Sequence, residues 1–428
     1  MIVKNFKRLA TTGNKKLALS IIEQGISGAM PNVTLEKIVK QNSLHVGKKK
    51  IPLGKYRRIY VVAIGKSADA MTSTVDSLTR IHGGLVVMPD TTSSLIKKKK
   101  FTIIRSSHPI PTKKSTTAAR KIIEFLKFLE ATDLVIFLIS GGASSLVSLP
   151  DGISLQDKQL TTYLLLRSGA NIREINCVRK HLSQVKGGRL VESLGCKAVS
   201  LVMSDVVGDD LSVIASGITY CDKSTFSDAK KILIKYDLTN LVPKTVWKRI
   251  VIGTKGVIPE TPKKPKIQNY VIQSNRTCVD LMKTRAQKLG FITKAVYSVE
   301  GNVYDVASKL SKHVPRSKNF CLVFGGEPTV AVKGKGKGGR NQELVLYLLK
   351  KLKDRDKKIT IASAGTDGID GNTCVAGAIA DCTMPTKPID KYLNENNSYH
   401  YFKKYGGLIF TGSTHTNLMD VGLILLQK

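Results

Sequence analysis

The chain has 428 residues, of which 42% are hydrophobic and 23% are charged, and its formal net charge is +36 at pH 7. This length exceeds what one hydrophobic core usually holds, so two domains are expected, and the composition excludes an intrinsically disordered chain. No apolar run is long and unbroken enough for a bilayer, and the seven scattered cysteines form no Cys-x-x-Cys pair. These features disfavour a membrane protein, a disulfide framework and a structural zinc site, and they predict a cytoplasmic protein.

In the first half of the chain, strand-like runs that end in glycine or serine alternate with helix-like stretches. Strands are expected at residues 59–64, 84–88, 134–139 and 198–203, and helices at residues 118–129 and 155–166. This alternation predicts a parallel sheet covered by helices on both faces, with ligands at the carboxyl ends of the strands. We expect this first domain to cover residues 1–240.

Prolines gather in residues 241–268, which predicts a linker. A second α/β domain is expected over residues 269–428. Its strands are predicted at residues 270–272, 292–297, 320–324, 359–363 and 407–410, the last of them closing the series.

Two strand ends in the first domain carry candidate anion-binding residues. Lys66 follows the strand at 59–64, but Tyr60 stands where a P-loop needs its first glycine, so that motif is rejected. Lys66 can still meet an anion, although a surface lysine at a turn is nearly as good an interpretation. The turn after residues 134–139 contains Gly141, Gly142, Ser144 and Ser145. Their backbone N–H groups and hydroxyls could donate to an anion, but a tight turn with no ligand explains these residues equally well.

Two further segments are strongly basic. Arg179 and Lys186 lie at helix-like spacing, which fits an anion-facing surface and a solvated helix face about equally well. Residues 325–343 place Glu327 before a ribbon of alternating glycine and lysine that ends at Arg340 and a helix-like run. Glycine and a helix start suit a phosphoryl group, while a flexible basic hairpin is the other interpretation of this segment alone.

Carboxylates follow two strands. Asp205, Asp209 and Asp210 come after the strand at 198–203, and Asp367 and Asp370 come after the strand at 359–363. In so basic a protein these clusters favour Mg²⁺ binding or a contact to a substrate hydroxyl, with helix capping as the alternative for the first cluster. Cations that offset phosphoryl charge, together with carboxylates that hold Mg²⁺, are what phosphoryl transfer requires.

The motifs, taken in order over roughly residues 55–420, resemble the type-2 glycerate kinases, which combine an N-terminal kinase-associated domain with a C-terminal MOFRL domain. The matching segments are residues 63–66, 107–111, 138–142, 178–182, 186–189, 204–205, 208–212, 325–329, 338–343 and 365–371. The chain departs from the usual pattern at Asn372, Ser413 and His415.

The resemblance implies ATP- and Mg²⁺-dependent phosphorylation of D-glycerate to 2-phosphoglycerate in a cleft between a Rossmann-like three-layer domain and an α/β domain with a mixed sheet. It implies that Lys66 and Arg340 are the catalytic cations and that Mg²⁺ is held by Asp205, Asp209 or Asp367. Contacts to substrate or nucleotide are expected from Gly141, Gly142, Ser144, Ser145, Arg179, Lys186, Asn275, Glu327 and Asn341. A monomer or homodimer is expected.

Two alternatives stay open. Some relatives of this family are labelled hydroxypyruvate reductases, which would use NAD(P)H. The net charge of +36 also favours binding to nucleic acid or other anions. Only 6% of the residues are aromatic and no arginine–aromatic platform for stacking bases is found, so no specific nucleic-acid partner is expected.

Overall fold

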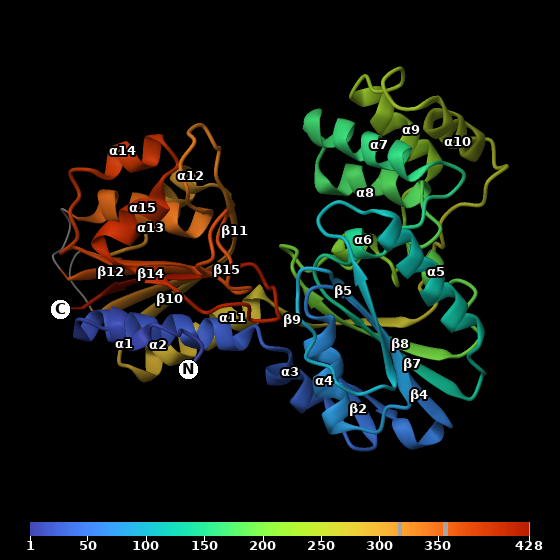
Figure 1. Cartoon of the computed structure of the whole chain (residues 1–428), viewed down its shortest axis with the longest axis horizontal. Helices are drawn as coiled ribbons and strands as arrows, with labels where there is room; N and C mark the ends of the chain where they lie inside the picture. Colours follow the sequence, from blue (N-terminus) through green and yellow to red (C-terminus); the bar gives the residue numbers. More distant parts are fainter. Residues whose placement is uncertain (316–318, 354–357, 428) are drawn as a thin grey trace. The chain divides into compact units, whose positions relative to one another are not determined.

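Figure 1 shows the computed structural model, which describes residues 1–315, 319–353 and 358–427. The chain divides into two compact units, one formed by Thr34–Ile272 and the other by Met1–Val33 together with Gln273–Lys428. We call them the sheet-and-helix unit and the mixed-sheet unit. Among the described residues, none of the helices combines the length and the apolar character that crossing a bilayer requires.

The sheet-and-helix unit is built on a six-stranded sheet in the order β6-β5-β4-β7-β8-β9. β4 to β8 all pair in parallel, and Val62 of β4 lies between Leu85 and Phe137 of its neighbours. β5 and β7 are buried along their whole length, as expected of strands with helices on both faces. The prediction of a mostly parallel sheet is confirmed. The strands are β4 (Arg58–Ile64), β5 (Gly83–Pro89), β6 (Phe101–Ser106), β7 (Asp133–Ile139), β8 (Lys197–Ser204) and β9 (Gln268–Ser274), with helices α3 (Pro31–Ile38), α4 (Ala68–Leu78), α5 (Lys113–Lys127) and α6 (Ala143–Leu146), and a small antiparallel sheet of β1 (Val39–Lys40), β2 (Ser43–Val46) and β3 (Lys49–Pro52).

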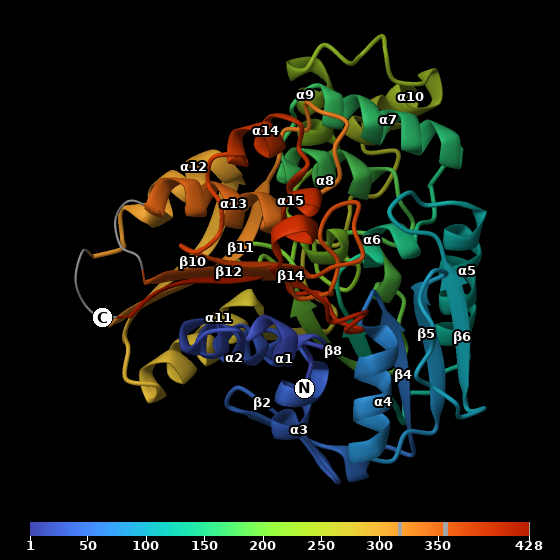
Figure 2. The same ribbon diagram turned by 60° about the vertical axis from the view of Figure 1, so that its left-hand side comes forward.

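Four helices of this unit gather around a separate small core, as Figures 1 and 2 show. They are α7 (Leu155–Arg167), α8 (Ile172–His181), α9 (Phe226–Lys235) and α10 (Lys244–Thr254). Leu165, Val178, Phe226 and Ile250 meet in the core they share. α10 therefore occupies part of the segment 241–268 that was predicted as a linker, because its apolar face is buried on the neighbouring helices. Residues 255–267 form the turns and loops that follow it.

The mixed-sheet unit has six strands in the order β10-β11-β15-β12-β13-β14. β10 and β11 are parallel and the remaining pairs are antiparallel, so the predicted mixed sheet is confirmed. The central strand β15 lies after the segment predicted to be the last strand, and the sequence analysis missed it. The strands are β10 (Ile292–Asn302), β11 (Phe320–Thr329), β12 (Ile359–Gly365), β13 (Gly377–Asp381), β14 (Leu408–Ile409) and β15 (Asp420–Leu426).

Helices cover both faces of this sheet (Figure 1). One face carries α2 (Gly13–Gly28) and α11 (Asn275–Lys288), with the short α1 (Phe6–Leu9) beside them. The other carries α12 (Val303–Ser311), α13 (Arg340–Leu352), α14 (Ile389–Asn394) and α15 (Ser398–Tyr405).

The first 33 residues belong to this unit, whereas the sequence analysis assigned them to the N-terminal domain. The reason is the fit between α2 and α11. A Cβ atom on Gly25 would lie 2.5 Å from the Sδ of Met282, and one on Gly28 would lie 3.2 Å from the Cα of Cys278. Glycines on this face of α2 let the two helices approach closely, and α2 buries Leu19 and other apolar side chains in the process.

A leucine at position 25 should therefore destabilise the protein. Gly25→Leu must displace the buried Met282, and overpacking of this kind costs about 1–3 kcal/mol. Gly13→Leu, in the same helix but with no atom within 4 Å of its added Cβ, should change the free energy of unfolding by no more than about 0.5 kcal/mol. Urea unfolding of both variants measures the difference, and equal stabilities would contradict the packing of α2 on α11.

Candidate active site

Lys66 lies where the chain connections of the parallel sheet diverge. β4 leads through α4 to β5 on one side, whereas β7, on the other side of β4, leads to β8. Ligands of such sheets bind beyond the carboxyl ends of the two central strands. The backbone N–H of Lys66 donates to the carbonyl of Gly141 over 2.8 Å, so the loops after β4 and β7 form one surface.

The contact between these loops depends on glycine. Gly65 has a φ of +136°, and a Cβ there would lie 2.2 Å from the Oγ of Ser140. That hydroxyl accepts a hydrogen bond from the N–H of Ser67 at the start of α4, at 3.0 Å. Any other residue at position 65 would push the two loops apart.

His108 shares this surface with Lys66. A Cβ on Gly142, whose φ is +82°, would lie 3.0 Å from the ring of His108 and 3.4 Å from the Cγ of Lys66. Burial lowers the pKa of His108 to about 4, and the charge of Lys66 adds to this effect. The imidazole is therefore neutral at pH 7. The sequence analysis quoted His108 within a family motif but did not propose it as a site residue.

Asp205 faces the same loop from the end of β8. A Cβ on Gly141 would lie 2.2 Å from the Oδ2 of Asp205, so the carboxylate rests directly on this glycine. The other two carboxylates of the cluster lie further along the chain. Asp209 has a φ of +55° in the turn after Asp205. Asp210 pairs with Arg173 at 3.2 Å and accepts from the N–H and hydroxyl of Ser212, as a capping residue would.

Ser144 and Lys186 are linked behind this surface. Lys186 is fully buried, and its Nζ donates to the carbonyl of Ser144 over 2.8 Å. The hydroxyls of Ser144 and Ser216 lie 2.5 Å apart, and Ser216 donates to the side chain of Asn176. The N–H of Ser145 donates to the carbonyl of Gly142, which closes the turn into α6.

Two other cations, Arg179 and Lys158, act electrostatically on Lys186. Burial lowers the pKa of Lys186 well below its ordinary value, and the charges of Arg179 and Lys158 lower it further. Burial also lowers the pKa of Arg179 to about 10. The charge of Arg179 thus acts on Lys186, and so does that of Lys158, which the sequence analysis did not consider.

Arg340 opens α13 in the mixed-sheet unit and is held by two carboxylates. Its Nε donates to the Oδ2 of Asp420 at 2.5 Å and its Nη2 to the Oδ1 at 3.1 Å, while its Nη1 donates to Glu327 at 2.7 Å. Burial alone would lower the pKa of Arg340, but the charge and hydrogen bonds of Asp420 raise it above the ordinary value. The guanidinium therefore keeps its charge. Asp420, the first residue of β15, was missed together with that strand.

The N-terminus of α13 is already occupied by a carboxylate of the protein. Asp370 is buried, and its two oxygens accept from the backbone N–H and the side-chain amide of both Asn341 and Gln342, at 2.8–3.2 Å. The amide oxygen of Asn341 accepts from Ser363 at 2.6 Å. The helix start therefore offers its first N–H groups to Asp370, although the sequence analysis favoured a phosphoryl group at this position.

Two other predicted residues have structural contacts. Asn275 is buried and donates to the carbonyls of Leu418 and Asp420, both at 2.8 Å, which ties α11 to the start of β15. Asp367 is half-buried, and its carboxylate accepts from the N–H of Ile369 at 3.0 Å.

The glycine ribbon before Arg340 is pinned along its length. The N–H groups of Lys333 and Gly334 donate to the side chain of Asn396, that of Lys337 to Asn397, and that of Gly338 to Asn372. Cβ atoms on Gly334 and Gly336 would lie within 2.4 Å of the backbone of Glu395. The glycines thus allow close packing on residues 395–397 and do not form an open phosphate cradle. Asn372, one of the departures from the family pattern, contributes one of these contacts.

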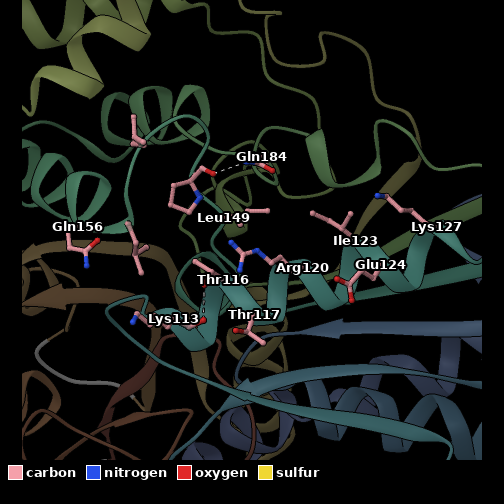
Figure 3. Close-up of a pocket in the computed structure, with 13 residues that line it drawn as sticks. Lys113, Thr116, Thr117, Arg120, Ile123, Glu124, Lys127, Leu149, Gln156 and Gln184 are labelled. Carbon is pink, nitrogen blue, oxygen red and sulfur yellow. Dashed lines mark hydrogen bonds between the residues drawn. The ribbon is translucent and has the colours of Figure 1, made fainter.

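A pocket of about 660 Å³ lies elsewhere, along α5 (Figure 3). Lys113, Arg120 and Lys127 of this helix line it, opposite Leu149 and Gln184. None of the predicted site residues lines it, so this pocket and the predicted chemistry do not coincide.

Both halves of the chain match known families. Residues 17–251 match a family described as "Domain of unknown function (DUF4147)", and residues 320–420 match the MOFRL family.

Relatives resemble the chain over almost its whole length. It is 38% identical to the "Glycerate 2-kinase" of Pyrococcus horikoshii, over 97% of this chain and 98% of that protein. It is 37% identical to the "D-glycerate 2-kinase" of Thermotoga maritima, over 96% and 98%. The crystal structure of a glycerate kinase from Thermotoga maritima matches 96% of this chain and 99% of its own, with a TM-score of 0.84 and 36% identity.

The pinned ribbon can be released by one substitution. Asn396→Ala removes the acceptor for Lys333 and Gly334 and the contact of Asn396 to Glu343, so amide hydrogen exchange at residues 333–334 should accelerate by at least about tenfold. Asn394→Ala, an exposed neighbour, is the control. Exchange measured by mass spectrometry or NMR checks this expectation, and unchanged protection in Asn396→Ala would contradict it.

Proposed function

Because this chain belongs to the glycerate kinase family that joins a DUF4147 domain to a MOFRL domain, we propose that it transfers the γ-phosphoryl group of ATP to the 2-hydroxyl of D-glycerate. The product is 2-phosphoglycerate. The observation that carries this proposal is the near full-length similarity to two proteins named as glycerate 2-kinases.

Lys66 is the cation of the reacting centre in the sheet-and-helix unit. Phosphoryl transfer depends mainly on positioning and on offsetting the charge of the moving group. Lys66 stands at the switch point of the sheet, on a loop whose backbone is fixed to Gly141 and Ser140. The neutral His108 beside it adds no competing charge, and its ring can accept a hydrogen bond from a substrate hydroxyl.

Arg340 is the second cation. Asp420 fixes the guanidinium from the buried side, whereas Glu327 is an exposed partner. A phosphoryl oxygen can replace Glu327 at the Nη1 atom while the two bonds to Asp420 keep the orientation. That Lys66 and Arg340 act together in a cleft between the domains stays a prediction from the family resemblance.

Mg²⁺ is part of this proposal. Among residues 1–315, 319–353 and 358–427, no group of three His, Cys, Asp or Glu side chains could hold a metal without help. Mg²⁺ commonly binds through one or two carboxylates and the substrate phosphates, so one carboxylate at the reacting loop is enough for it. Asp205 is that carboxylate, and the ion would offset charge on the nucleotide phosphates. Asp209 and Asp367 stay predictions, as do the cytoplasmic location and the monomer or homodimer.

The alternative function, an NAD(P)H-dependent reductase, is not supported by the contacts of the glycine ribbon before Arg340. Residues 334–339 do read Gly-x-Gly-x-x-Gly ahead of a helix. A dinucleotide turn offers its N–H groups and the helix start to a pyrophosphate. Here the ribbon N–H groups bind asparagine side chains, and Asp370 caps the helix.

Product analysis tests the proposed reaction. With D-glycerate, ATP and Mg²⁺ the protein should release ADP, and phosphorus NMR should show 2-phosphoglycerate. A 3-phosphoglycerate signal would contradict the regiochemistry, and the absence of any phosphorylated product would contradict the function. Oxidation of NADH or NADPH with hydroxypyruvate, measured in parallel, should stay at background.

Substitution of the two cations tests their roles. Lys66→Ala and Arg340→Lys should each lower kcat by at least about 10²-fold, the typical loss when one charge-stabilising group of a transition state is removed. Arg340→Lys is chosen because an alanine would leave the buried Asp420 without a partner. Lys351→Ala, an exposed cation at the end of α13, is the control. Near-normal turnover with a retained circular dichroism spectrum would overturn the assignment.

A further inference from the structure

Lys158, on the first turns of α7, is buried without a partner. Its residue is 3% exposed, and its Nζ has no hydrogen-bond partner among the residues that the structure describes. An ammonium group in such a place is costly, because it loses its hydration and gains nothing in exchange. Buried lysines are therefore usually paired, as Lys180 is with Asp222 at 3.2 Å.

The groups around Lys158 make its position harder to explain as structural. Arg179 of α8 lies close enough for its charge to lower the pKa of Lys158, and both act in the same way on the fully buried Lys186. The opposing charge is Asp151, which precedes α7 and is itself paired with Arg249 of α10. Lys158 and Lys186 are buried and Arg179 is half-buried, so these three cations face a carboxylate, Asp151, that already has a partner.

This cluster is connected to the reacting loop. Lys186 donates to the carbonyl of Ser144, two residues after Gly142, where an added Cβ would meet His108 and Lys66. An anion held by the cluster would therefore sit on the same loop as the proposed site of phosphoryl transfer. In D-glycerate the carboxylate is bonded directly to the carbon that carries the 2-hydroxyl, so the two sites must be neighbours.

We propose that Lys158, Arg179 and Lys186 form the subsite for the carboxylate of the substrate, with Lys158 as the residue that contacts it. The inference rests on the proposed function and names which residues select a 2-hydroxy acid. The burial of both lysines suits one small anionic group, whereas a chain of nucleotide phosphates needs a more open surface. The bound carboxylate supplies the negative charge that the interior lacks.

The subsite has a pH signature. Burial, with the charge of Arg179, lowers the pKa of Lys158 to about 7, and Asp151 opposes this shift. Only the protonated lysine attracts a carboxylate, so in the free protein the binding form is lost as the pH rises above about 7. A bound carboxylate raises the pKa again. Binding near pH 8 should therefore take up a proton, and KM for D-glycerate should rise between pH 7 and pH 9.

Lys158→Met is the decisive variant, because methionine fills the same space without charge. It should raise KM for D-glycerate at least about tenfold, equivalent to about 1.4 kcal/mol, and leave KM for ATP within about twofold. Its melting temperature should equal or exceed that of the wild type, because an unpaired buried charge has been removed. Arg167→Met removes an exposed cation from the same helix and should change neither KM.

The outcomes separate the inference from the function on which it rests. Absence of wild-type turnover with D-glycerate would overturn both. Normal wild-type turnover with an unchanged KM for D-glycerate in Lys158→Met would overturn the subsite alone. A rise in KM for ATP instead would assign the cluster to phosphate, and a lower melting temperature with unchanged KM would assign Lys158 a structural role; both results contradict the proposal.

A second measurement needs no variant. Calorimetry of D-glycerate binding to the wild type at pH 8, in buffers of different ionisation enthalpy, should show uptake of a fraction of a proton. Binding without proton uptake would overturn the role of Lys158.

Discussion

The ion pair between Arg340 and Asp420 is the interaction around which the mixed-sheet unit is organised. It joins the start of α13 to the start of the central strand β15, and the side chain of Asp420 is 4% exposed. A buried charge pair gains little net stability, because both partners lose hydration. Here the pair fixes the orientation of the Arg340 guanidinium. Asn275 donates to the carbonyl of Asp420 at the same strand start, so the direction of the guanidinium follows from how the sheet is built.

The two units hold their charges in opposite ways. In the mixed-sheet unit each buried carboxylate near Arg340 is matched by donors, and Asp370 alone accepts from two backbone and two side-chain groups. In the sheet-and-helix unit Lys158 has no hydrogen-bond partner among the described residues, and the pKa values of Lys158 and Lys186 are lowered by burial and by neighbouring cations. A satisfied network fixes a shape, whereas an unsatisfied one favours a ligand of the missing charge.

Much of the architecture could be predicted from the sequence because the parallel strands are apolar on both faces and end in glycine. The motifs also marked Lys66 and Arg340 correctly as residues at element ends. The sequence did not reveal which groups these residues contact in the folded protein. The glycine ribbon has the composition of a phosphate loop, yet its N–H groups donate to asparagines that lie 34 to 63 residues away in the sequence. Lys158 resembles any lysine on an amphipathic helix, and only the packing of α7 on α8 makes it an interior charge. β15 was missed because the short polar turn before it was read as the end of the fold.

The packing of α2 on α11 has a consequence for how the chain assembles. α2 precedes the sheet-and-helix unit in the chain, whereas its partner α11 follows that unit, in the segment Gln273–Lys428. The sheet-and-helix unit, continuous from Thr34 to Ile272, has all its contacts available earlier. Domains generally fold as units during synthesis, so this middle unit folds first. The apolar face of α2 can therefore be covered only after Gln273–Lys428 has been synthesised, and segments from before and after the sheet-and-helix unit then form one domain.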